Sequence, residues 1–454
     1  MDPVSPFSIS MADAEKSSKP SGEKPTPGNQ VVGPDLSDIE HSSIADNPNL
    51  LTFSSPTDPL NPLNWPPSKK LSAILIITLT TLLSPIGSTI SAAAGPTITS
   101  SLSPSSPPSE TLTTLITTIY LLGYTSGPLA IAPLSELYGR SILYKICISL
   151  FLLFNIACAL APSVSSLIAF RFLAGIAGSC PVTLGTASIA DMVVKEKRGG
   201  AMAGYIIGAV LGPALGPVAG GYLVEQGVSW RWVFWVMAIA TGPLAVVIVL
   251  ELVPGMAESY AVVLLRWKTE RLRRETGNGE LRSVMETGRE RRGWDLVGFA
   301  MVRPVKMLLG LPIVGLLSLY AAVVYSYLYL CFTTFGTVFG SQYGLGTGAA
   351  GLAPLGIGVG SVAGVVFCGL VSDRLSAYLA RKYGGDVKPE YRLPVMVIGG
   401  VCVPVGLFWY GWTAEYKLHW MLAIVGTGFL GVGMVITYVS PDPPLSSLLS
   451  ASSI

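Results

Sequence analysis

One arginine lies inside an apolar segment, and its chemistry is the first feature of this sequence that needs an explanation. Arg171 stands about seven residues into the apolar stretch 164–188, and no Asp or Glu lies near the middle of any comparable stretch. A charge at that depth in a membrane costs roughly 2.5–3.5 kcal/mol. The guanidinium must therefore either face a water-filled cavity or donate to carbonyls and hydroxyls of adjacent helices. Its functional role would be contact with an anionic ligand or proton coupling.

A second pattern places glycine at every fourth residue of one apolar segment. The run contains Gly204, Gly208, Gly212, Gly216 and Gly220, with Pro213, Pro217 and Gly221 added. Residues four apart share one face of a helix, so a ridge of glycine lets a neighbouring helix approach closely. The two prolines leave carbonyls about four residues earlier without partners, which favours a bend. The pattern predicts a closely packed helix that acts as a gate, and tight packing without movement is the alternative.

Tyrosines gather in and near the same segments. Tyr325 and Tyr329 are four apart in one apolar stretch, and Tyr124 and Tyr205 occur in the first half of the chain. They are candidates for the lining of a pocket that binds amphipathic or cationic organic molecules by stacking and cation–π contact. Packing in the protein core is the more common role of such residues.

The composition excludes most other chemistry. Only 12% of the 454 residues are charged and 50% are hydrophobic, whereas a soluble domain carries about a quarter charged residues. The net charge of +2 argues against a nucleic-acid partner. Two His and six scattered Cys without a CxxC spacing predict no metal site, no cofactor and no Ser-His-Asp arrangement. We therefore do not expect an enzyme.

Ten apolar segments are long enough to cross about 30 Å of hydrocarbon at 1.5 Å per residue. Their predicted limits are 71–94, 112–134, 142–161, 164–188, 201–223, 232–252, 308–334, 347–371, 394–412 and 418–439. The chain is thus predicted to be an all-α, multi-pass integral membrane protein. Residues 1–68, rich in Ser, Pro and acidic residues, are predicted to form a disordered tail without a signal peptide.

The Lys and Arg residues set the predicted orientation. With the N-terminus in the cytoplasm, the exceptions to the positive-inside rule among the 29 basic residues are Arg171, Arg231 and Lys417. The loop 253–306 then also lies in the cytoplasm and separates a six-helix bundle, 69–252, from four helices, 307–439. A solvated connector is the simpler interpretation of this loop, and an amphipathic helix near Leu264 on the inner leaflet is the alternative.

Several motifs resemble one transporter family. The segment Gly127–Arg140, after the second span, resembles the signature loop of the major facilitator superfamily, and Arg171 to Gly175 resembles its fourth-helix arginine motif. The run Gly212 to Gly221 resembles the fifth-helix motif of its antiporters. Further segments resemble the fungal drug:proton antiporter branch, of the multidrug and polyamine type: Asn61–Trp65, Trp230–Trp235 and Pro389–Pro394. Gly369–Arg374 looks like a degenerate second copy of the signature loop after the eighth span.

The resemblance implies a fold of two six-helix bundles that rock about a central site. It also implies a cytoplasmic latch, in which Glu136 caps a helix N-terminus in the facing bundle while Arg140 pairs with Asp191. A surface pair of this kind contributes only about 0–1 kcal/mol, which suits a contact that must open in every cycle.

The sequence departs from this pattern at its end, because family members have twelve spans and ten are visible here. Residues 440–454 are too short and too rich in Pro and Ser to cross a membrane, and a truncated gene model is the simplest explanation.

We expect a secondary active transporter in the plasma membrane that exports amphipathic small molecules, such as drugs, toxins or secondary metabolites, in exchange for protons. Its partners would be the small-molecule substrate, protons and the lipid bilayer, and it would act as a monomer. A truncated non-transporting membrane protein or sensor, and an uptake symporter, are the alternatives.

Overall fold

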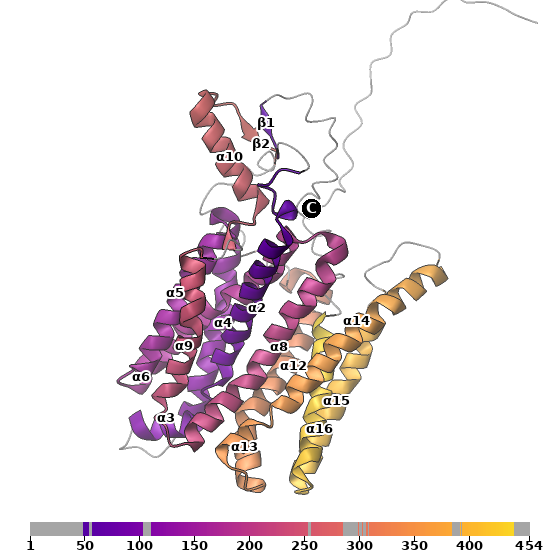
Figure 1. Cartoon of the computed structure of the whole chain (residues 1–454). Helices are drawn as coiled ribbons and strands as arrows, with labels where there is room; N and C mark the ends of the chain where they lie inside the picture. Colours follow the sequence, from indigo (N-terminus) through magenta and orange to yellow (C-terminus); the bar gives the residue numbers. More distant parts are fainter. Residues whose placement is uncertain are drawn as a thin grey trace, which may run out of the picture.

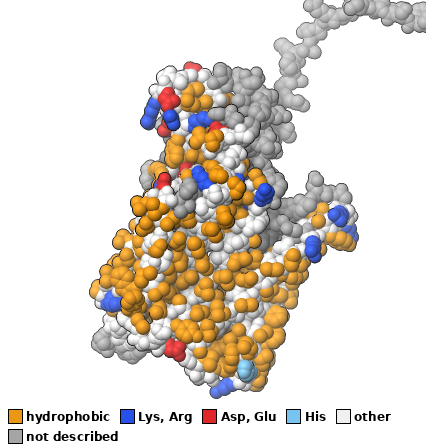
Figure 2. Space-filling view, in the orientation of Figure 1, with side chains coloured by type: hydrophobic (Ala, Val, Ile, Leu, Met, Phe, Trp, Pro, Cys, Tyr) orange, Lys and Arg blue, Asp and Glu red, His pale blue; other side chains and the backbone are white. Residues whose placement is uncertain are grey.

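The computed structural model describes residues 49–53, 57–102, 110–252, 256–284, 298, 302, 306, 308–383, 391 and 393–439. Ten helical spans in this part of the chain are long and apolar enough to cross a membrane. They match the ten predicted segments one for one, with shifts at their ends. The space-filling view agrees, because hydrophobic side chains cover the body of the visible face while charged side chains gather toward its two ends (Figure 2).

The helices pack as two bundles. The first consists of α2 (Pro67–Thr89), α3 (Gly95–Leu102), α4 (Glu110–Tyr138), α5 (Arg140–Ala159), α6 (Val164–Gly178), α7 (Cys180–Met192), α8 (Lys195–Glu225) and α9 (Arg231–Val249). The second consists of α12 (Pro312–Thr337), the short π-helix η3 (Val338–Gln342), α13 (Thr347–Gly351), α14 (Leu355–Tyr383), α15 (Leu393–Glu415) and α16 (Trp420–Val439). Contacts between the bundles run mainly from α8 to α13 and α14 (Figure 1).

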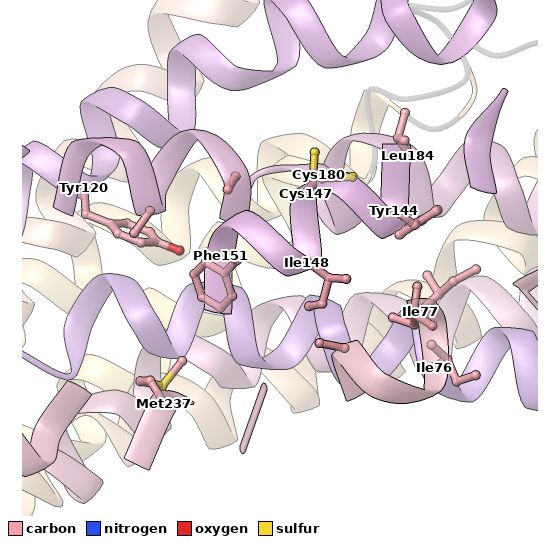
Figure 3. Close-up of a cluster of buried hydrophobic side chains, with 14 of the residues drawn as sticks. Ile76, Ile77, Tyr120, Tyr144, Cys147, Ile148, Phe151, Cys180, Leu184 and Met237 are labelled. Atoms are coloured by element: carbon pink, nitrogen blue, oxygen red, sulfur yellow. The ribbon is translucent and has the colours of Figure 1, made fainter. Parts of the chain in front are cut away.

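Each bundle has its own hydrophobic core. In the first, side chains from α2, α4, α5, α7 and α9 meet, including Ile77, Tyr120, Phe151, Leu184 and Met237 (Figure 3). The core of the second bundle contains aromatic residues of α12 and η3. Phe335 contacts both Phe332 and Phe339 edge to face. The six-helix and four-helix halves therefore each have an apolar interior of their own.

The packing of the second bundle partly repeats that of the first. The helix α6 packs on α4 and α5, and α16 packs in the same way on α14 and α15. In the first bundle α9 also packs against α5 and α2. At the corresponding place between α15 and α12 lies an apolar groove of about 530 Å³, lined by residues that include Tyr320, Tyr327, Phe408 and Trp412.

Two expectations about the signature-like segments are wrong in their local structure. The helix α4 continues through Tyr138, so Gly127–Arg140 is helical up to a sharp turn at Gly139, whose φ is +99°. The second copy, Gly369–Arg374, lies within α14 and not in a loop after it. The sequence-based limits of both helices were set at the last apolar residues. A helix can continue beyond the apolar layer as long as its backbone hydrogen bonds are made.

Residues 49–53 and 57–68 of the predicted disordered tail are structured, which corrects the sequence-based boundary at residue 68. The strand β1 (Leu50–Leu51) pairs in parallel with β2 (Arg282–Ser283), and the 3-10 helix η1 (Pro62–Asn64) leads into α2. Residues 1–48 lie outside the described part of the chain, as do residues 440–454 and most of 285–307.

The predicted helix in the central loop is present as α10 (Ala261–Thr276). It projects beyond the ends of the spanning helices, and we refer to that end of the molecule as the α10 end (Figure 1). Lys268 on α10 lies 3.3 Å from the buried carboxylate of Asp58, and its ammonium also donates to the Thr52 carbonyl. Helix α10 therefore contacts the chain segment that precedes α2.

Candidate functional site

Arg171 is sealed inside the first bundle, where it closes the C-terminal end of α2. Its side chain is 1% exposed. The guanidinium donates to the carbonyl oxygens of Gly87 at 2.6 Å and Ser88 at 3.3 Å, to the Ser91 hydroxyl at 2.9 Å and to the Ile116 carbonyl at 3.1 Å. The carbonyls of Gly87 and Ser88 belong to the last turn of α2, which has no further helical N–H groups to bind them. A cation at this position satisfies them and complements the helix dipole.

Aromatic rings cover the Arg171 guanidinium. Its central carbon lies 4.8 Å from the ring centre of Tyr120 and 5.7 Å from that of Phe234. The Tyr120 hydroxyl in turn donates to the Ser84 carbonyl of α2 at 2.8 Å. Of the two environments predicted for Arg171, the structure contains the carbonyls and hydroxyls of adjacent helices. The prediction that Arg171 faces a water-filled cavity is wrong for this conformation, because its side chain is 1% exposed.

Glycine brings α6 and α4 close enough for this arrangement. Arg171 and Gly175 are four residues apart and face α4. A methyl group on Gly175 would lie 3.0 Å from both the Tyr120 carbonyl carbon and the Tyr124 nitrogen, and nearer still to the Tyr120 carbonyl oxygen. The spacing of the arginine motif thus has a direct physical reason, because the glycine permits the approach that the arginine spans.

The glycine ridge of α8 packs against α2. A methyl group on Gly208 would lie 3.1 Å from the Thr78 carbonyl oxygen, and one on Gly212 would lie 2.8 Å from that of Leu82. One on Gly216 would lie 2.9 Å from the Ile86 carbonyl oxygen, and one on Gly220 would overlap the Ile90 carbonyl. Gly204, the first member of the predicted ridge, meets nothing within 4 Å. The close contact therefore runs from Gly208 to Gly220.

The prolines of α8 act as predicted at one place. Pro217 has no N–H, which leaves the carbonyl of Pro213 without its helical partner. The Thr89 hydroxyl of α2 donates to this carbonyl at 3.0 Å. The C-terminal end of α2 thus lies between the Arg171 guanidinium on one side and the α8 ridge on the other.

One hydrogen bond joins this region to the second bundle. The hydroxyls of Ser88 and Tyr329 are 3.3 Å apart, and Ser88 also donates to the Pro85 carbonyl. Because the Ser88 carbonyl accepts from Arg171, a single residue of α2 contacts both the buried arginine and α12. Tyr329 was predicted from its spacing with Tyr325, and both are partly buried on α12.

The four predicted tyrosines come from three helices: Tyr124 from α4, Tyr205 from α8, and Tyr325 and Tyr329 from α12. Tyr124 stacks on Tyr120, with ring centres 5.9 Å apart. Tyr205 is 3% exposed, and its hydroxyl donates to the Val182 carbonyl at 2.9 Å. The prediction of a pocket role is wrong for Tyr205 in this conformation, because α8 turns that ring into the core of the first bundle.

Further contacts between the bundles lie at the end opposite α10. Gly221 faces the Thr347 carbonyl, Gly351 faces the backbone of Pro217, and Gly358 faces Ala214. The Glu225 carboxylate lies directly against Gly346 and Gly348, where a methyl group would overlap it. Toward the α10 end, α14 leans away from α8 (Figure 1). The bundles thus meet along one half of α8.

The predicted ion pair at the α10 end is present. Arg140 Nε lies 3.4 Å from Asp191 Oδ2, and Nη1 donates to the Ser135 hydroxyl at 2.9 Å. The Arg140 guanidinium also lies 4.9 Å from the ring centre of Tyr260. Both charged partners belong to the first bundle, where the pair joins the start of α5 to the end of α7 and the Ser135 contact joins it to α4.

A carboxylate that the sequence analysis missed caps the helix at this corner. Glu258 is 5% exposed and accepts hydrogen bonds from the backbone N–H groups of Arg140 at 2.9 Å and Ser141 at 3.1 Å. It also accepts from Ser259 and Tyr260. The sequence analysis predicted a capping role for Glu136, which would cap a helix N-terminus in the facing bundle. Glu136 is half-buried in the last turn of α4, and the described cap is made by Glu258 within the first bundle.

Gly139 makes the Glu258 cap possible. Its backbone is left-handed, and a methyl group there would lie 2.7 Å from the Glu258 carboxyl carbon. No spacing marks Glu258 in the sequence, since it lies in a connector about 117 residues from its partner.

A second feature that the sequence analysis missed did carry a signal, because Gly356, Gly360 and Gly364 recur at every fourth residue. They pack against α16 as the α8 ridge packs against α2.

Comparisons with known proteins agree with this architecture. The family model described as Major Facilitator Superfamily matches residues 77–452. The chain is 49% identical to the MFS-type transporter penM of Penicillium rubens, over 90% of this chain and 78% of that protein. It is 38% identical to the efflux pump radE of Floropilus chiversii, over 92% and 76% of the two chains. The xylose transporter XylE from E. coli, in a partially occluded inward-open conformation, has the same fold, with a TM-score of 0.59 at 18% identity over 84% of this chain and 85% of that one.

Proposed function

The chain belongs to the Major Facilitator Superfamily and is a multi-pass membrane transporter, and we propose that it exports amphipathic small molecules in exchange for protons. We place the transporter in the plasma membrane. The distribution of Lys and Arg favours an orientation with the N-terminus and the α10 end in the cytoplasm. Two bundles rock about the contacts between them and expose a central site to each side in turn. The transporter works as a monomer.

The observation that carries this proposal is the one-sided contact between the bundles. The α8 ridge packs closely on α2, while other residues of the same stretch of α8, including Ala214, Pro217 and Gly221, touch small residues of α13 and α14. Contacts between small residues bury little side-chain area, so they can separate and re-form. In the proposed orientation these contacts lie toward the outside and α14 leans away from α8 toward the cytoplasm, which is the arrangement expected when an exporter accepts its substrate (Figure 1).

Export is favoured over uptake by two observations. The run from Gly212 to Gly221 has the antiporter-type spacing, and its prolines and glycines make the contacts expected of a helix that moves as a unit. A related fungal protein also carries the name efflux pump. For this chain, direction of transport and coupling to protons are proposals.

We assign the proton-sensitive contact to the pair Arg140–Asp191, together with Glu136 on the same corner. Arg171 has its donors occupied by α2 and α4, so it positions helices and does not exchange protons with a cavity. Protonation of Asp191 removes the charge that holds Arg140 and loosens the corner at the α10 end. Release of the proton restores it.

The test uses sealed inside-out plasma-membrane vesicles from yeast cells that produce the chain. A panel of fluorescent amphipathic compounds is added outside, with an imposed pH gradient, acid inside. Accumulation that collapses with a protonophore, and that is absent from vesicles without the protein, supports proton-coupled export. Asp191→Asn should uncouple accumulation from the gradient at unchanged protein abundance.

Three results would contradict parts of the proposal. Accumulation that ignores the gradient would exclude proton coupling. Transport only in the opposite direction would identify an uptake symporter. No transport of any compound, at normal abundance and membrane insertion, would identify a non-transporting membrane protein.

A further inference from the structure

The charges of the ten spans are distributed in a way that restricts the substrate. The acidic residues of these helices lie away from the middle of the apolar stretches: Glu110 and Glu196 are in the first turns of α4 and α8, and Glu136, Asp191, Glu225, Asp373 and Glu415 follow the apolar middles of their helices. The described spans therefore place no carboxylate near mid-span, where a positively charged molecule would cross between the bundles. A cation in a low-dielectric path without a counter-charge is strongly disfavoured.

Arg171, which is buried within the spans, is also not accessible to a ligand in this conformation. The guanidinium of Arg171 donates four hydrogen bonds to protein oxygens, and the rings of Tyr120 and Phe234 lie over it. Its charge is balanced by the C-terminal dipole of α2. An anionic molecule would have to break these bonds in order to pair with it.

Apart from Glu225, the groups described at the junction of the two bundles are uncharged. The hydroxyls of Ser88 and Tyr329 meet there, and the other described contacts along α8 come from Ala214, Pro217 and Gly221. A hydroxyl both donates and accepts a hydrogen bond, so it can bind carbonyl, ether or hydroxyl groups of a ligand. Glu225 is the charged residue described at this junction, and it lies at the far end of α8.

We infer that the transported molecule is uncharged, with an aromatic or polycyclic body and hydroxyl or carbonyl groups. The inference rests on the proposed export function and narrows its substrate class. It replaces the cationic ligand that the tyrosine content of the sequence suggested. Ring faces of Tyr329 and Tyr124 supply stacking, and hydroxyls of Ser88 and Tyr329 supply orientation.

Three dyes that share the phenoxazine ring system separate charge from shape. Nile red is uncharged, Nile blue is its cationic relative of similar size, and resorufin is an anion. Uptake of each dye is measured in the inside-out vesicles under one pH gradient, at equal free concentration, with vesicles lacking the protein as the background. Nile red should accumulate at least about tenfold faster than Nile blue or resorufin, because a charge in the interior costs more than a tenfold factor in rate.

A gain of function tests the physical reason. Tyr329→Glu places a carboxylate at the junction, and Tyr329→Gln is the uncharged control of the same length. Tyr329→Glu should raise the ratio of Nile blue to Nile red transport above that of Tyr329→Gln by about tenfold, the reverse of the penalty for an unpaired charge. Protein abundance is matched by immunoblot.

The outcomes separate this inference from the proposed function. Nile blue or resorufin carried as fast as Nile red would overturn the uncharged substrate class and leave export intact. An equal dye ratio in Tyr329→Glu and Tyr329→Gln would show that charge at the junction does not select the substrate. No transport of any of the three dyes, with the protein inserted normally, would count against the export function itself.

Discussion

The α8 ridge allows a prediction whose sign differs between two glycines of one helix. Gly204 and Gly216 both lie in α8, twelve residues apart, and each is replaced by alanine. Alanine is a better helix former than glycine by about 0.5–1 kcal/mol in a helix interior. That gain is common to both sites, so the difference between the variants reports on packing alone.

The structure gives the packing difference. A methyl group on Gly204 meets nothing within 4 Å. A methyl group on Gly216 would lie 2.9 Å from both the Ile86 carbonyl oxygen and the Ile90 nitrogen, and closer still to the Thr89 hydroxyl. Two of these neighbours are backbone atoms that cannot rotate away, so α2 and α8 must separate. Overpacking of this kind costs about 1–3 kcal/mol.

We therefore expect Gly204→Ala to stabilise the protein by up to about 1 kcal/mol and Gly216→Ala to destabilise it by about 1–2 kcal/mol. The separation at Gly216 also disturbs the Thr89 hydroxyl that binds the Pro213 carbonyl, so transport per molecule should fall in that variant. Gly204→Ala should transport like the parent.

The assay is thermal unfolding of the detergent-solubilised protein, followed by the fraction that elutes as a monodisperse peak after heating. The midpoint should rise slightly for Gly204→Ala and fall by several degrees for Gly216→Ala. Equal midpoints for the two variants would refute the reasoning, because they would mean that α2 does not contact α8 at Gly216.

Three other predictions concern the remaining contacts. Arg171→Ala should lower stability by about 3 kcal/mol by leaving the buried carbonyls of Gly87 and Ser88 unpaired, while Arg171→Lys, with three donors, should lose less; equal midpoints for the two variants would contradict this. Glu258→Ala should lower stability by about 1–2 kcal/mol through loss of the α5 cap, measured by the same heating assay, and Glu275→Ala on exposed α10 should be neutral; a neutral Glu258→Ala would exclude the cap. Gly348→Ala should weaken the closed junction by pushing against Glu225, and Gly336→Ala, which meets nothing within 4 Å, should not. Faster labelling of Ala214→Cys, which faces Gly358 across the junction, by a membrane-impermeant maleimide in the Gly348→Ala background reports this, and unchanged labelling would show that the junction tolerates the methyl group.

Much of the architecture followed from residue types alone. A helix that crosses a membrane must be long and apolar whatever it packs against, because backbone polar groups have no partner in hydrocarbon. The ten spans, the division near residues 253–306 and the helix α10 were therefore predictable from local composition. The pair Arg140–Asp191 was also correct, since its residues match a family motif.

The same local signals failed where a neighbour in space decides the result. Helix ends moved because hydrogen bonding continues beyond the apolar residues, as in α4 and α14. The strand β1 and Asp58 are held in place by β2 and Lys268, and both partners lie more than 200 residues away. Composition alone describes this part of the chain as a disordered tail.

The site shows the same division. The sequence alone determined that Arg171 needs partners and that the ridge of α8 removes side-chain bulk, because burial cost and helix periodicity are properties of each segment. Only the tertiary structure decided that both features act on α2. Its last carbonyls lie within reach of Arg171 because Gly175 lets α6 approach α4, and its Thr89 hydroxyl lies against α8 because Gly216 has no side chain. Which oxygen meets which donor depends on how the helices cross, and that is set by contacts between segments far apart in the chain.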